Sequence, residues 1–147
     1  MPVKYVLIYS FAADYFNQYQ GGGTLSHTDS ATYNFAKATD VTQCSWSMTA
    51  YANTDTYSSA PACSASVSVE LYYAGAWHTI AAASQSGSTT ASASIGATDY
   101  TIYKDVTAAR YSNGASAQSD HDERVTLTTS SLVLYTTPPI TGHAGVV

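Results

Sequence analysis

The chain contains few charged residues. Five Lys and Arg and ten Asp and Glu are spread over 147 residues, which gives a formal net charge of −5. The basic residues form no cluster, and a basic cluster is what neutralises nucleic-acid phosphates or anionic lipid headgroups. The longest apolar run, residues 5–9, is far shorter than the roughly 20 residues of a membrane-spanning helix. We therefore expect neither nucleic acid nor membrane among its partners.

Large aliphatic side chains are also scarce. Leu, Ile, Val and Phe together number 24, whereas Ser, Thr and Ala occupy 63 positions. So low an aliphatic content is typical of disordered chains, but disorder also requires a high net charge, which is absent here. Thirteen Tyr and two Trp add large apolar surfaces. We predict one folded domain over residues 1–137, with a thin core of Tyr and small side chains, and a C-terminal tail over residues 138–147.

Helical spacing of apolar residues is missing, and alternation of apolar and polar residues recurs instead. In residues 41–52, Cys44, Trp46 and Met48 share the face that we predict to be buried, and residues 65–73 alternate in the same way. Further strands are predicted at residues 3–11, 32–37, 99–106 and 123–135, with a hairpin in residues 81–95 around Gly87. The first of these, residues 3–11, is expected to be covered on both faces. Apolar parity changes near Ser130 and Ser131, which predicts a β-bulge.

Loops are predicted between these strands. They lie at residues 20–23, 53–61 and 111–122, the last because it contains Asn113-Gly114. Seven or eight short strands separated by turns predict an all-β fold, an antiparallel β-sandwich of jelly-roll or immunoglobulin-like type. The sequence leaves the strand order open.

A hairpin is predicted around Ala74 and Gly75. A two-residue loop pairs Tyr72 with Trp77 and Val69 with Ile80, so that Ile80 is buried and the aromatic pair lies on the outer face. A three-residue loop would bury Trp77 instead, and we favour the first register. Exposed aromatic rings stack on sugars or anchor protein interfaces. Tyr72 and Trp77 are therefore candidate interface or glycan-stacking residues, although the pair also suits simple hairpin packing.

Other candidate residues are few. Cys44 and Cys63 suit either a disulfide, worth about 3 kcal/mol in the chain-entropy model, or two reduced thiols, which we favour. Asp120, Asp122 and Glu123 offer oxygen ligands for calcium, but a solvated loop is the simpler interpretation.

Motifs of catalytic and metal sites are missing from the sequence. The four His lie far apart without metal-ligand spacing, and there is neither a Gly-x-Ser-x-Gly nucleophile motif nor a Gly-rich phosphate loop. We expect a protein that is not an enzyme and that requires no cofactor, unless calcium binds.

Ser/Thr/Ala-rich strands such as residues 91–95, the start at Met1 and an uncharged terminal arm over residues 136–147 carry a resemblance. In these features the chain resembles small all-β bacteriophage virion proteins, such as head decoration or tail accessory proteins. The resemblance implies a structural protein of a virus particle, assembled in the host cytoplasm and located in the virion. Its expected partners are other virion proteins and further copies of itself in a homo-oligomer.

A carbohydrate-binding module is the alternative. Residues 67–80 and 125–135 are similar in pattern to strands of galactose-binding jelly rolls. That resemblance implies a glycan partner at Tyr72 and Trp77, with calcium at residues 120–123.

Overall fold

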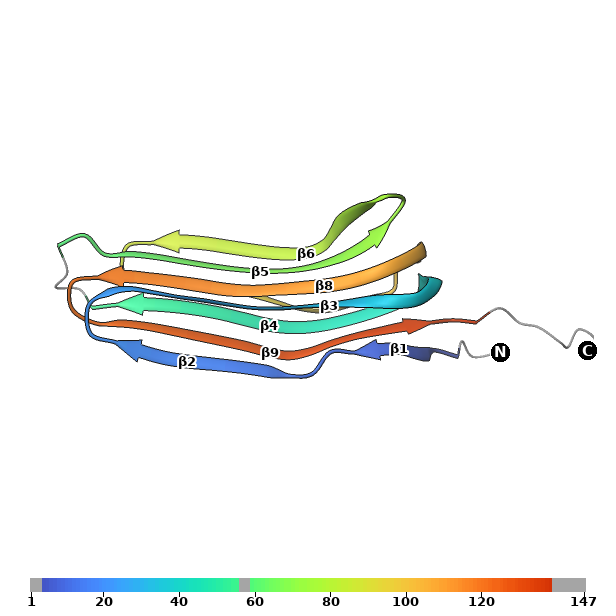
Figure 1. Cartoon of the computed structure of the whole chain (residues 1–147), viewed down its shortest axis with the longest axis horizontal. Helices are drawn as coiled ribbons and strands as arrows, with labels where there is room; N and C mark the ends of the chain where they lie inside the picture. Colours follow the sequence, from blue (N-terminus) through green and yellow to red (C-terminus); the bar gives the residue numbers. More distant parts are fainter. Residues whose placement is uncertain (1–3, 56–58, 139–147) are drawn as a thin grey trace, which may run out of the picture.

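Alternating apolar and polar residues give each strand one face for the core and one for the surface. The computed structural model describes residues 4–55 and 59–138, and within them nine strands form two antiparallel sheets packed face to face (Figure 1). The first sheet contains β1 (Val6–Ser10), β2 (Asp14–Gln20), β4 (Gln43–Thr54), β7 (Thr90–Asp99) and β9 (Glu123–Thr136). The second sheet contains β3 (Gly23–Val41), β5 (Ala62–Tyr73), β6 (Ala76–Gly87) and β8 (Tyr103–Ser119). The predicted antiparallel β-sandwich is confirmed, with nine strands in place of seven or eight.

The strand order is that of a jelly roll. β2 pairs with β9, β3 with β8, β4 with β7, and β5 with β6, so these strands fold as nested antiparallel pairs. The first sheet has the order β1-β9-β4-β7, with β2 also beside β9, and the second has the order β3-β8-β5-β6. Of the two sandwich types that the sequence leaves open, the structure has the jelly roll.

The core lies between the two sheets and is built from small and medium side chains. Trp46 is 7% exposed and points inward, as predicted. The largest fully buried apolar side chains come from β4, β5 and β9: Met48, Leu71, Leu127, Leu132 and Leu134. The bulge predicted in β9 is also confirmed, because Ser47 pairs with Ser131 and Met48 with Thr129, which leaves Ser130 without an opposite residue.

Two long strands differ from the prediction. β3 extends well beyond the predicted residues 32–37, and β8 continues to Ser119 through the predicted loop at residues 111–122. Asn113-Gly114 is not a turn. The Asn113 side chain is fully buried, and a Cβ at Gly114 would lie 2.7 Å from the Oγ1 of Thr28 on the neighbouring strand. Asn113 and Gly114 therefore suit a packed position inside the sheet, where the side chain of one is buried and the other has no room for a Cβ.

Smaller corrections concern strand ends and edges. The predicted strand at residues 99–106 spans the end of β7 and the start of β8. β1 is an edge strand whose Leu7 is 55% exposed, so it is not covered on both faces. The expected hairpin around Gly87 is instead a crossover, because β6 and β7 belong to different sheets. β2 was not predicted as a strand, and the turn predicted at residues 20–23 joins it to β3 with positive φ at Gly22 and Gly23.

Aromatic stacks close one lateral side of the sandwich. Tyr9 of β1 stacks on Tyr33 of β3 with ring centroids 3.9 Å apart, and Phe16 of β2 stacks on His27 of β3 at 3.7 Å. The His27 ring also bonds Asp29 through Nε2 at 2.7 Å. These contacts join the two sheets where β1 and β2 face β3.

The strands run along the long axis of the molecule (Figure 1). None of the described residues forms a helix that is long and apolar enough to cross a membrane. The predicted C-terminal tail lies outside the described residues, except for Pro138.

Candidate functional site

The hairpin aromatic pair forms as predicted. Tyr72 pairs with Trp77 across the β5–β6 hairpin, and their rings lie edge to face with centroids 5.3 Å apart. Val69 pairs with Ala81 in place of the predicted Ile80, because Ile80 is an extra residue in β6. Ile80 is therefore only partly buried.

One face of the Trp77 ring is covered by a residue that the sequence did not indicate. The Arg110 guanidinium carbon lies 3.9 Å from the centroid of the Trp77 ring. Its Nε donates to Glu70 Oε1 at 2.8 Å, so the cation is held over the indole by an ion pair. Glu70 lies two residues before Tyr72 on β5, so alternation places both on the outer face. Arg110 reaches this face through the β5–β8 register, which pairs it with Glu70 and does not follow from the sequence. The cation covers one of the two ring faces on which a sugar could stack.

Glu123, a candidate calcium ligand, is a buried hydrogen-bond acceptor for two turns. Its side chain is 1% exposed and accepts hydrogen bonds from the Gly22 amide at 3.2 Å, from Gln20 Nε2 at 3.3 Å and from the Ser119 hydroxyl. The carboxylate thus joins the β2–β3 turn to the β8–β9 turn.

The two aspartates of the predicted calcium loop have other contacts. Asp120 accepts from Ser59 and contacts the His121 ring at 3.2 Å, and the Asp122 carboxylate accepts from the Tyr19 hydroxyl. Among residues 4–55 and 59–138, no group of three His, Cys, Asp or Glu side chains is arranged to hold a metal ion. Calcium at this loop stays a prediction.

The two cysteines are free thiols. Cys44 begins β4 opposite Leu134, near the end of β9, whereas Cys63 begins β5 opposite Ala117, near the end of β8, so they lie at opposite ends of the sandwich. Burial raises the pKa of the Cys44 thiol to about 12, and burial also raises the pKa of Cys63. The disulfide considered from the sequence does not form.

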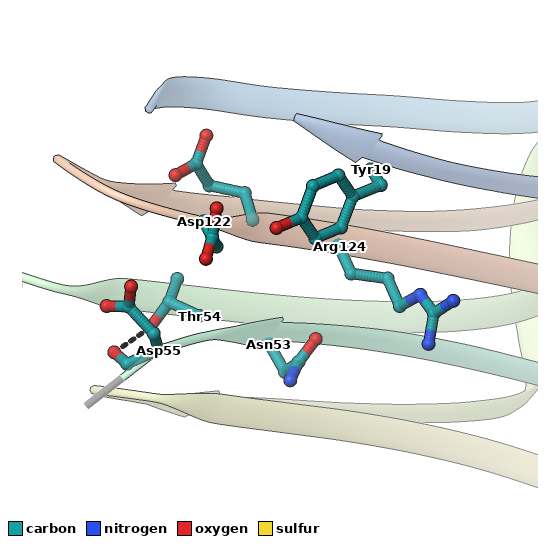
Figure 2. Close-up of a pocket in the computed structure, with 7 residues that line it drawn as sticks. Tyr19, Asn53, Thr54, Asp55, Asp122 and Arg124 are labelled. Atoms are coloured by element: carbon teal, nitrogen blue, oxygen red, sulfur yellow. Dashed lines mark hydrogen bonds between the residues drawn. The ribbon is translucent and has the colours of Figure 1, made fainter. Parts of the chain in front are cut away.

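A shallow depression lies on the first sheet near the β8–β9 turn (Figure 2). Its volume is about 290 Å³, and it is lined by side chains from β2, β4 and the start of β9: Tyr19, Asn53, Thr54, Asp55, Asp122, Glu123 and Arg124. Tyr19 pairs with Arg124, which pairs with Asn53, so one row across three strands forms the floor. The sequence singled out Asp122 and Glu123, but it missed Tyr19 and Asn53, which meet them only through the strand register.

The depression combines an exposed ring with polar groups. Tyr19 is 61% exposed, and the Asp122 carboxylate that accepts from its hydroxyl raises the pKa of Tyr19. In Figure 2 the Tyr19 hydroxyl and the Asp122 carboxylate point toward one another. An aromatic face beside an amide, a guanidinium and a carboxylate suits a neutral polar ligand held by stacking and hydrogen bonds.

Further exposed apolar side chains lie on the same sheet. Tyr15 is 65% exposed and faces outward on β2 with Tyr19. At the other end, the ring of Tyr5 contacts the rings of Tyr100 and Tyr135, with centroids 6.1 and 6.5 Å away. The most exposed large apolar side chains of the described chain are Val6, Leu7, Tyr15, Tyr19, Tyr100 and Ile102.

No protein family model, no curated protein and no solved structure shows a significant match to this chain.

Proposed function

We propose that this chain is a non-enzymatic structural or accessory protein of a virus particle, a capsid decoration or tail component, that acts through contacts with further copies of itself and with other virion proteins. The observation that carries this proposal is the outer face of the first sheet. Exposed Leu7, Tyr15 and Tyr19 lie on β1 and β2 in a chain with a net charge of only −5. Exposed apolar side chains grouped on one face favour burial against another protein, and a charge-poor surface opposes it little.

The jelly roll is compatible with this function without deciding it. Viral capsid domains use this fold, and so do lectin domains. Function depends on the surface that the fold presents, so the fold adds only consistency.

Light scattering on the purified chain tests the proposal. We expect a particle mass that is a multiple of the 15.5 kDa chain mass and that increases with concentration. A mass of 15.5 kDa at every concentration up to millimolar would overturn self-assembly.

Carbohydrate binding is the second candidate, and the depression at Tyr19 is the observation that favours it. On this alternative, Tyr19→Ala abolishes binding to the glycans that the wild-type chain recognises on a glycan panel, because the stacking ring is lost. Trp77→Ala is the matched aromatic control and retains binding, since Arg110 already covers that ring. A panel on which the wild-type chain gives no signal removes this alternative.

A further inference from the structure

β7 is an edge strand whose backbone groups face away from its partner. Within the described residues, β7 pairs only with β4. The Ser92 amide donates to the Oε1 of Gln85 at 2.8 Å, so Ser92 directs its backbone groups away from β4. Backbone direction alternates along an antiparallel strand, so Ser94, Gly96 and Thr98 direct theirs the same way. Such a row of N–H and C=O groups is a template for another strand.

β7 lacks the features that usually protect an edge. It contains neither Pro nor Lys, and its register with β4 is unbroken from Asp99 to Thr90. Three of the four other edges are interrupted, and the fourth, β2, is unbroken but has only seven residues. β1 has a register shift after Leu7, β3 shifts after Asn34 and contains Lys37, and β6 has the bulge at Ile80.

The lateral side formed by β6 and β7 carries small apolar side chains that are partly exposed. On the opposite side, at β1, β2 and β3, aromatic stacks cover this position instead. Ala81 and Ala83 of β6 and Ile95 of β7 pack against the core and are only partly buried, whereas Ala91 and Ala93 of β7 are buried in it. A protein that joins here therefore gains apolar contact as well as backbone hydrogen bonds.

The charge pattern fits a second copy of the same chain. A two-fold axis places the residue on the axis opposite its own copy, so that residue has to be uncharged for the edge to pair with itself. Asp99, at the end of β7, is the only Asp, Glu, Lys or Arg in β6 and β7. With Ser94 on the axis, Ser94 faces Ser94 of the second copy, and Ser92 faces Gly96. Each of these residues directs its amide outward, and on pairing the Ser92 amide exchanges its bond to Gln85 for one to Gly96 of the second copy.

We propose that two copies of this chain join along β7, with antiparallel β7–β7 pairing about a two-fold axis near Ser94, so that the first sheet continues from one copy into the other. This inference rests on the proposed self-assembly and adds a contact surface at β7, separate from the exposed face of β1 and β2. The partner is a second copy of the chain, recognised by backbone pairing between uncharged edges.

Substitutions at Ser94 test the pairing. Ser94 is exposed and its amide faces outward, so Ser94→Lys and Ser94→Pro leave the bonds to β4 intact. Lys places two positive charges opposite each other, and Pro removes a donor at the axis. We expect each variant to raise the dissociation constant of the dimer by about tenfold or more in sedimentation velocity, which corresponds to about 1.4 kcal/mol.

Ser30→Lys is the matched control, because Ser30 is an exposed serine on β3, the edge strand on the lateral side opposite β6 and β7. We expect it to leave the dissociation constant unchanged, and circular dichroism to show that all three variants are folded. An oligomer that persists in both Ser94 variants, or that Ser30→Lys dissociates, overturns the β7 interface while self-assembly stands. A wild-type chain that is monomeric at every concentration overturns the interface and the proposed function together.

Discussion

Asn113→Asp is expected to lower the free energy of unfolding by about 3–5 kcal/mol, the range for a buried charge without a partner. Asn113 is fully buried in β8, and its Nδ2 donates to Thr49 O at 3.2 Å, Thr128 O at 3.1 Å and Thr129 Oγ1 at 3.2 Å. Each acceptor belongs to the opposite sheet, so one amide joins the two layers beside the β9 bulge.

The aspartate replaces the amide nitrogen, which donates to all three acceptors, by an oxygen. The resulting carboxylate faces two carbonyl oxygens and a hydroxyl, and the other oxygen position, Oδ1, already has no partner in the described structure. Repulsion between the carboxylate and the carbonyl oxygens and the loss of carboxylate hydration both lower the free energy of unfolding. Urea unfolding followed by tryptophan fluorescence measures the change. The control is Asn34→Asp, the same substitution at an exposed site on β3, for which we expect a change within about 0.5 kcal/mol.

Glu123→Ala is expected to lower the free energy of unfolding by about 2–4 kcal/mol, because hydrogen bonds to a charged group are worth about 1.5–3 kcal/mol each and do not add fully. The substitution leaves the Gly22 amide and the Ser119 hydroxyl without their shared acceptor at a site that is 1% exposed. The two turns at this end of the sandwich then lose their connection.

Glu123→Gln separates shape from charge. It keeps one acceptor oxygen and the side-chain volume, so we expect a smaller loss of unfolding free energy than for alanine in the same experiment.

Calcium addition is the second test of Glu123. Calcium chloride is expected to leave the melting temperature of the wild-type chain unchanged, because Glu123 is committed to the turns. A melting temperature that rises with calcium, and that no longer does so in Glu123→Gln, would contradict this role and restore the calcium site.

Strands with strict alternation were predictable from the sequence. β4, β5 and β9 carry apolar residues at every second position, so their inward faces and the Ser130 bulge followed directly. β3 was predictable only around Tyr33 and Phe35, because its other inward positions include His27, Asp29 and Ala31. A polar or small inward residue weakens the period-two pattern even where a long partner strand fixes the conformation.

The candidate sites were predictable only where they are local. Tyr72 and Trp77 pair across one hairpin, so turn length alone placed them together. The depression at Tyr19 depends on the β2–β9–β4 register, and Arg110 reaches Trp77 through the β5–β8 register. Neither register follows from residues that are close in the sequence. The loop predicted at Asn113-Gly114 was wrong for a related reason, because packing between strands overrides the turn preference of these two residues.

Amide hydrogen exchange at low and high protein concentration tests self-assembly most directly. On raising the concentration, we expect slower exchange at Ser94, Gly96 and Thr98, whose amides face outward from β7, and no change at Ala93 and Ile95, whose amides bond β4. Protection that appears only elsewhere would move the interface to another surface. Identical exchange of every amide at all concentrations would contradict self-assembly itself.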